Sequence, residues 1–177
     1  MKNITNQLLQ HSRGLAFATL LCAGVLLGSG LGLQTRALSA DAPVAWSVTN
    51  QLGKQVNSSS MVGRVTIVNF WATYCIPCMI EMPTLHELET KYGKSGLSIV
   101  GVSVDAQSNA MLQAFVEKFK MNYTVAMANP EIMSGFRVND SVPMTFILDQ
   151  QGRIVRKHAG YVKKEELEKD VRELLKL

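Results

Sequence analysis

The two cysteines Cys75 and Cys78 constrain the fold of this chain more than any other feature of its sequence. Only Ile76 and Pro77 separate them. They follow a short apolar run that ends at Trp71 and precede a segment with helical periodicity, so the pattern predicts a strand, a tight loop and a helix that begins at the first cysteine. A helix N-terminus has unpaired amide donors and a partial positive charge, which lower the pKa of a thiol placed there.

This placement indicates dithiol–disulfide exchange. A thiolate at Cys75 can attack a partner's disulfide, and Cys78, one helical turn along, can then close an intramolecular disulfide and release the partner. A structural disulfide with so short a loop would add little stability, and two inert thiols would not need this strand-to-helix context. A zinc site would need a second pair of ligands, and the remaining candidates are scattered along the chain: Cys22, His11, His86 and His158.

The distribution of charge argues against nucleic acid as a partner. The formal net charge is +4, from 18 basic and 14 acidic residues. Lys2, Arg13 and Arg36 are the only charged residues before Asp41, which leaves 15 basic and 14 acidic residues in the rest of the chain. There the basic residues are interspersed with acids rather than clustered as a backbone-binding surface requires. We therefore predict no nucleic-acid partner.

Residues 1–40 are typical of a signal anchor or a signal peptide. Residues 14–33 carry no charge and are long enough to span the roughly 30 Å hydrocarbon core of a membrane, which favours an anchor. Ala37-Leu38-Ser39-Ala40 offers small residues for a signal peptidase, which favours cleavage. More basic charge precedes the apolar segment than directly follows it, so we expect the N-terminus to stay inside and residues 41–177 to form a domain outside the membrane.

Periodicity predicts alternating strands and helices in this domain. The expected strands are 44–48, 64–71, 97–104, 123–127, 144–148 and 154–158. The expected helices are 76–92, 109–120, 130–135 and 163–177. This order predicts an α/β fold with a central mixed β-sheet flanked by helices on both faces.

Two stretches of the sequence carry a resemblance to a known family. They are Asn69-Phe70-Trp71-Ala72-Thr73-Tyr74-Cys75-Ile76-Pro77-Cys78, followed by Glu81-Met82-Pro83, and Val142-Pro143-Met144-Thr145-Phe146-Ile147-Leu148-Asp149 with Gly152. These stretches resemble the thioredoxin-like superfamily, and within it the membrane-tethered TlpA/ResA type of bacterial thiol-disulfide oxidoreductases. The resemblance covers about residues 44–177 and implies a thioredoxin-like fold.

The resemblance also implies roles for residues of the second stretch. Pro143 would be cis and lie beside the cysteine pair, and the backbone at Val142 would pair with an extended stretch of substrate. An ordinary proline that starts a strand is the alternative. Met144 stands where Thr is more usual in the family, and we expect it to alter the contact with substrate.

Other residues near the cysteines are expected to contact a partner. Tyr74 and Trp71, with Phe146, would form an apolar collar where partners dock, although Trp71 and Phe146 are equally compatible with an ordinary core position. Tyr74 replaces the Trp that is usual before the first cysteine. Pro77 is also expected to contact substrate, and the dipeptide that contains it tunes the reduction potential.

Glu81 is a further catalytic candidate. It lies one turn beyond Cys78, and the resemblance makes it a group that tunes the cysteine pKa values or moves protons; the alternative is a surface carboxylate favoured by the helix dipole. Asn69 stands where cytosolic thioredoxins have a buried acid. Because Asn cannot accept a proton, Glu81 or water would have to serve instead.

The sequence therefore predicts a thiol-disulfide oxidoreductase whose catalytic residues are Cys75, Cys78, Pro143 and Glu81. Its only redox centre would be the Cys75–Cys78 disulfide, with no metal or other cofactor. As the resemblance implies, electrons would come from a membrane thiol donor in the bacterial cell envelope and pass to an exported protein, such as apocytochrome c or a copper-site assembly factor. The sequence alone does not separate a reductant from an oxidant.

Two rival functions use the same cysteines. A peroxiredoxin-like peroxidase needs a Thr-x-x-Cys setting, and here Thr73 is only two residues from Cys75. A Cu(I)-binding chaperone would use both thiolates together with His158.

Overall fold

The computed structural model describes residues 42–139 and 141–177. A five-stranded sheet with the order β5-β4-β3-β6-β7 forms the middle of this part of the chain. Neighbouring strands β3, β4 and β5 run parallel, while β6 is antiparallel to both β3 and β7. The strands are β3 (Val65–Trp71), β4 (Leu97–Ser103), β5 (Thr124–Met127), β6 (Met144–Leu148) and β7 (Ile154–Ala159). The predicted mixed sheet is confirmed.

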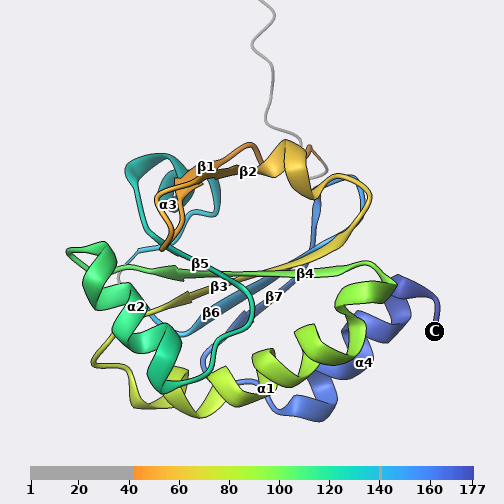
Figure 1. Cartoon of the computed structure of the whole chain (residues 1–177). Coiled ribbons are helices and arrows are strands. Elements are labelled where there is room, and N and C mark those ends of the chain that lie inside the picture. The colour runs from red at the N-terminus through yellow and green to blue at the C-terminus, as the bar shows by residue number, and fades with distance from the viewer. Residues whose placement is uncertain (1–41, 140) are drawn as a thin grey trace, which may run out of the picture. The chain divides into compact units, whose positions relative to one another are not determined.

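Helices cover both faces of the sheet, but unequally (Figure 1). One face carries the three long helices, which are α1 (Ile76–Tyr92), α2 (Asn109–Lys118) and α4 (Lys164–Leu175). The other face carries the short helix α3 (Pro130–Gly135) and a two-stranded ribbon of β1 (Ser47–Thr49) and β2 (Gln55–Asn57). The edge strand expected at 44–48 is thus displaced toward the C-terminus, and it pairs with β2 instead of extending the main sheet.

The central strand β3 is buried along its whole length. Because successive side chains of a strand point to opposite faces, the residues divide between two apolar layers. Val65, Ile67 and Trp71 pack beneath α1, whereas Val68 and Phe70 pack toward β1 and α3. Burial on both faces explains why the strand reads as a nearly continuous apolar run.

Local sequence signals fix the helix ends that matter for the site. Helix α1 begins after Cys75, carries Pro77 in its first turn and ends at Gly93, as predicted. Its buried face repeats every three or four residues: Cys78, Glu81, Met82, Leu85, Leu88 and Tyr92. Short 3₁₀ turns lie at Ser58–Met61 and Gly93–Ser95.

The membrane segment predicted within residues 1–40 lies outside the described residues. Among residues 42–139 and 141–177, no helix has the length and apolar character that crossing a membrane requires.

Candidate active site

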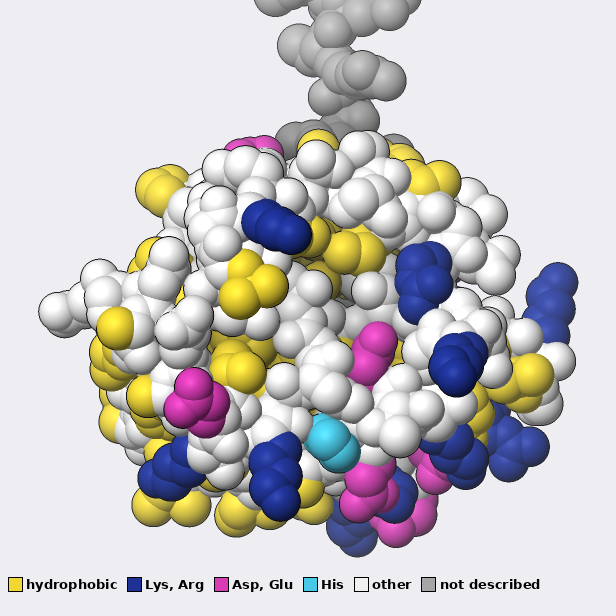
Figure 2. Space-filling view, viewed as in Figure 1, with side chains coloured by type: hydrophobic (Ala, Val, Ile, Leu, Met, Phe, Trp, Pro, Cys, Tyr) yellow, Lys and Arg dark blue, Asp and Glu magenta, His cyan; other side chains and the backbone are white. Residues whose placement is uncertain are grey.

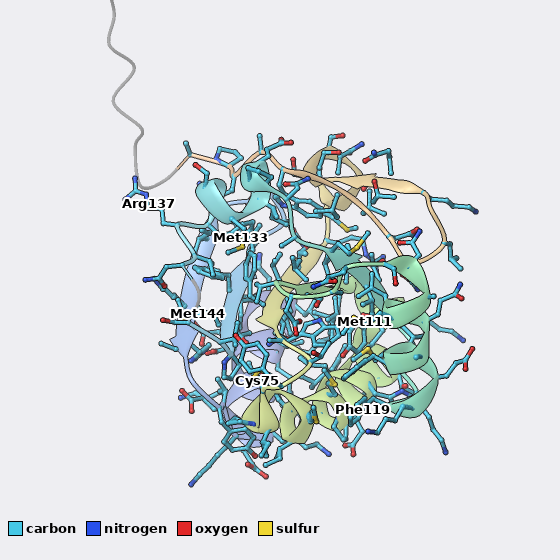
Figure 3. All side chains as sticks on the ribbon, turned by 90° about the vertical axis from the view of Figure 1, so that its left-hand side faces the viewer. Cys75, Met111, Phe119, Met133, Arg137 and Met144 are labelled. Carbon is cyan, nitrogen blue, oxygen red and sulfur yellow. A yellow bond between two sulfur atoms is a disulfide. The ribbon has the colours of Figure 1, made fainter. Side chains whose placement is uncertain are left out.

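Cys75 and Cys78 form a disulfide at the start of α1, with their Cα atoms 5.3 Å apart (Figure 3). Cys75 occupies the N-cap position, and its sulfur accepts a hydrogen bond from the backbone N–H of Cys78 at 3.2 Å. The first turn of α1 contains no acidic residue to oppose the positive end of the helix dipole. Cys75 is 6% exposed and Cys78 is 1% exposed, so a partner reaches Cys75 first.

The strand register places Pro143 at the end of the sheet where the cysteine loop begins. Phe70 of β3 pairs with Met144 of the antiparallel strand β6, so the chain after Trp71 and the chain before Met144 leave the sheet at the same edge. The Val142–Pro143 peptide bond is cis, as expected. Val142 packs against the apolar cluster that contains both cysteines. In Figure 3, Cys75 is labelled below and to the right of Met144.

Glu81 is fully buried, so its interpretation as a surface carboxylate is wrong. Its carboxylate accepts hydrogen bonds from the Asn69 side-chain amide at 2.9 Å and from the backbone N–H of Val162 at 3.2 Å. Burial raises the pKa of Glu81 from its ordinary 4.5 to about 7, although these hydrogen bonds favour the ionised form. The side chain can therefore take up and release a proton near neutral pH.

Asn69 holds Glu81 in place instead of acting as a base. It is buried on the face of β3 that α1 covers, and its Nδ2 donates to both Glu81 and the Thr145 hydroxyl, each at 2.9 Å. Thr145 lies directly opposite Asn69 in the β3–β6 register. Sequence reasoning identified Asn69 but missed Thr145 and Val162. The one available signal for such a network was a polar residue, Asn69, within an otherwise apolar predicted strand.

A third residue missed from the sequence, Asp105, orders the loop that precedes Cys75. Its carboxylate accepts hydrogen bonds from the Thr73 backbone N–H at 2.9 and 3.0 Å, and from the hydroxyls of Thr73 and Ser103. The carboxyl ends of the neighbouring parallel strands β3 and β4 meet at one edge of the sheet, which places Asp105 beside Thr73. The signal for this contact was the acid Asp105 directly after the predicted buried strand 97–104.

The structure divides the expected docking residues between surface and core. Tyr74 is 67% exposed, whereas Trp71 and Phe146 are each 1% exposed and belong to the core, so those two do not form a collar. Pro77 is exposed and Met144 is buried. Three other large apolar side chains near the cysteines are exposed, and with Tyr74 we call them the apolar rim: Tyr74, Ile76, Ile80 and Tyr161.

His158 does not join the cysteines. Its Nε2 lies 2.9 Å from Asp170 Oδ2 on α4. Among the described residues, no three His, Cys, Asp or Glu side chains are grouped as a metal ion requires, so the three groups of the Cu(I) interpretation are not brought together. On the face shown in Figure 2, basic and acidic side chains are interspersed.

Most of the chain is similar to known proteins. The model of the AhpC/TSA family matches residues 39–157. The thiol-disulfide oxidoreductase ResA of Bacillus cereus is 31% identical over 121 residues, which cover 68% of this chain and 69% of the relative. The thioredoxin-like protein YneN of Bacillus subtilis is 30% identical over 125 residues, which cover 70% and 72%.

A solved structure is similar along most of the described chain. The crystal structure of a thiol:disulfide interchange protein of the thioredoxin family from Chlorobium tepidum superposes with a TM-score of 0.69 at 28% identity. The match covers 76% of this chain and 95% of that one. Its fold is thus the fold described above.

Proposed function

This chain belongs to the AhpC/TSA family and is a thiol-disulfide oxidoreductase with a thioredoxin-like fold, and from this premise we propose that it reduces disulfides in exported proteins. The observation that carries the proposal is the Cys75–Cys78 disulfide at the N-terminus of α1, next to a buried carboxyl whose pKa lies near neutrality. The expected substrates include apocytochrome c and copper-site assembly factors, and the expected electron source is a membrane thiol donor.

The reaction begins with the reduced pair. The Cys75 thiolate attacks one sulfur of the substrate disulfide, the substrate S–S bond breaks, and a mixed disulfide forms while one substrate thiolate leaves. Cys78 then attacks the Cys75 sulfur, the Cys75–Cys78 bond forms, and the second substrate thiolate leaves. Two electrons pass to the substrate. Each leaving thiolate takes up a proton.

Glu81 is proposed to move the proton of the second step. The Cys78 thiol must lose its proton before it attacks, yet Cys78 is almost inaccessible to solvent. Glu81 lies three residues further along the same buried face of α1. A carboxyl with a pKa of about 7 is matched to proton transfer at neutral pH, so Glu81 accepts this proton during reduction of a substrate and returns it when the pair is recharged.

The apolar rim supports a polypeptide as substrate. Tyr74 and Ile76 flank Cys75 in sequence, and Ile80 lies one turn beyond Ile76 on α1. Tyr161 precedes Val162, whose amide binds Glu81. Exposed apolar groups around a reactive centre suit a partner with exposed apolar side chains, such as a chain that has not finished folding. The segment at Val142 supplies backbone for an extended partner strand.

The leader supports a position outside the cytoplasmic membrane. Residues 14–33 are uncharged and follow two basic residues, which favours a retained N-terminal anchor with the domain in the periplasm or on the outer face of the membrane. Such compartments are oxidising, so a reductant there must be recharged by thiols delivered through the membrane.

The reduction potential of the Cys75–Cys78 pair tests the proposed direction. Equilibration of the purified protein with dithiothreitol or glutathione buffers should give a value near the thioredoxin regime of about −270 mV. A value near −120 mV would identify an oxidant and overturn the proposal.

A trapping experiment tests the order of the cysteines. The C78S variant should accumulate a mixed disulfide between Cys75 and a disulfide-containing peptide, because the resolving thiol is gone. The C22S variant is the matched control and should turn over normally. Rapid turnover of peroxide by C78S would instead favour the peroxidase interpretation.

A further inference from the structure

A row of polar side chains crosses the sheet beneath α1 and α4. It consists of Asn69 on β3, Thr145 on β6 and His158 on β7, which are direct register partners: Asn69 with Thr145, and Thr145 with His158. Directly opposite residues of antiparallel strands point to the same face of a sheet. The adjacent residues on this face are apolar, such as Ile67 and Ile147, so the row is a polar line through an apolar layer.

The two ends of the row differ in their access to solvent. At the inner end, Asn69 and Thr145 bind the fully buried carboxyl of Glu81. At the outer end, the side chain of His158 is 16% exposed. The row thus joins the buried acid of the redox site to a histidine at the margin of the α4 interface.

The surroundings of His158 suit a positively charged ring. Its Nε2 lies 2.9 Å from Asp170 Oδ2, and its Nδ1 lies 3.5 Å from Glu166 Oε1; both residues belong to α4. A carboxylate can only accept hydrogen bonds, so a ring that faces one carboxylate with each nitrogen is best satisfied with a proton on both. Both ring nitrogens of His158 therefore face carboxylate oxygens of α4.

Other charged and titratable groups also lie near the row or near Glu81. Arg156, the next residue of β7 on this face, lies 3.5 Å from the second oxygen of Asp170 and also pairs with Glu173. Lys157 lies over the ring of Phe146, which belongs to the other apolar layer. Near Glu81 itself, burial and the Glu81 charge together raise the pKa of Tyr123 well above its usual range, so Tyr123 stays neutral.

We propose that His158, fixed by Asp170, is a positioning residue whose positive charge stabilises ionised Glu81 and thereby sets the pH at which Glu81 exchanges a proton with Cys78. Burial is the main influence on the pKa of Glu81 and raises it, while the charge of His158 acts in the opposite direction. The inference rests on the proposed role of Glu81 as the proton acceptor of Cys78.

The titration of Glu81 tests this directly. The carboxyl carbon of Glu81 is followed by ¹³C NMR across pH in the oxidised full-length protein, in which the cysteines do not titrate. The H158Q variant should lower the acid dissociation constant of Glu81 several-fold, because removal of a nearby positive charge disfavours the ionised carboxyl. The H86Q variant is the matched control: His86 lies on the same helix as Glu81 but contacts the Lys120 carbonyl, so its loss should leave Glu81 unchanged.

A third variant separates charge from packing. H158K keeps a cation at the position and should hold the dissociation constant near that of the unmodified protein. If H158K and H158Q move the titration equally, or if neither moves it, the inference is overturned. Because the comparison is between two substitutions at one site, a general loss of packing would shift both and would count against the proposal.

A rate measurement distinguishes this inference from the function on which it rests. The pH profile of resolution by Cys78 is measured for the unmodified protein, E81Q, H158Q and the double variant. If E81Q leaves the profile unchanged, Glu81 is not the proton acceptor and both proposals fall. If E81Q alters the profile but H158Q shifts neither the profile nor the Glu81 titration, only the role of His158 is refuted. In the E81Q background, H158Q should have no further effect.

Discussion

Replacing Glu81 by Gln should change how the stability of the protein depends on pH. In the folded protein the pKa of Glu81 is raised by burial to about 7, whereas the unfolded chain keeps the ordinary 4.5. Between these two values the folded state binds a proton that the unfolded state has released, so the free energy of unfolding falls as the pH rises. One pKa unit corresponds to 1.36 kcal/mol, and the shift therefore costs about 3 kcal/mol once the pH exceeds 7.

The E81Q variant removes this cost because its side chain cannot ionise. The substituted amide offers a single side-chain oxygen in place of the two of Glu81, so one of the hydrogen bonds from Asn69 and Val162 is weakened at every pH. That loss is a constant offset. Relative to the unmodified protein, E81Q should therefore gain about 3 kcal/mol of stability between about pH 4 and about pH 9, whatever its stability at the acidic end.

Urea denaturation across this pH range measures the difference. Both proteins are kept oxidised, so Cys75 and Cys78 do not titrate, and the ionisable groups that do not interact with Glu81 are common to the two and cancel. The gain should develop between the two pKa values of Glu81. If the stability curves of E81Q and the unmodified protein run parallel across the range, Glu81 does not titrate with a raised pKa, and its proposed role in proton transfer loses its basis.

Two further substitutions test other parts of the fold. D105A removes the acceptor of the Thr73 amide and hydroxyl, so it should lower the free energy of unfolding by about 2 kcal/mol and slow the attack of Cys75 on a disulfide peptide. D105N keeps an acceptor and should have smaller effects. Equal effects of D105A and D105N would contradict the assigned contacts. N129A removes the cap whose oxygen accepts the Ile132 amide at 2.9 Å, so it should cost about 1 kcal/mol in thermal denaturation without changing the reduction potential, and a changed potential would contradict a purely structural role.

Much of the fold could be predicted because its signals are local. The apolar run before Cys75 is rich in β-branched residues, and the resulting strand differs from the prediction by one residue at its start. The cap at Asn129 and the turn at Gly152, where φ is +79°, also act over a few residues. The first strand was misplaced because its position depends on pairing with Gln55–Asn57, which no periodicity in so short a segment reveals.

The surroundings of Glu81 could not be predicted in the same way. An acid near a helix start is ordinarily a surface residue that the helix dipole favours. Its burial follows from the packing of α4 against α1 and from contacts with Asn69, 12 residues away, and with Val162, 81 residues away. Such contacts depend on strand register and on the path of the chain after β7, and the spacing of the cysteine motif predicts neither.

The different positions of the two cysteines fix the order in which they react. Cys75 caps the helix beside the apolar rim, whereas Cys78 lies on the buried face of α1 with Glu81 one turn beyond it. For Cys78 to attack a substrate first, it would have to leave the core. In the proposed reaction, Cys78 instead resolves the mixed disulfide, with Glu81 as the acceptor of its proton. After brief reduction, a thiol-reactive probe should therefore label Cys75 before Cys78, and preferential labelling of Cys78 would contradict the roles assigned to both.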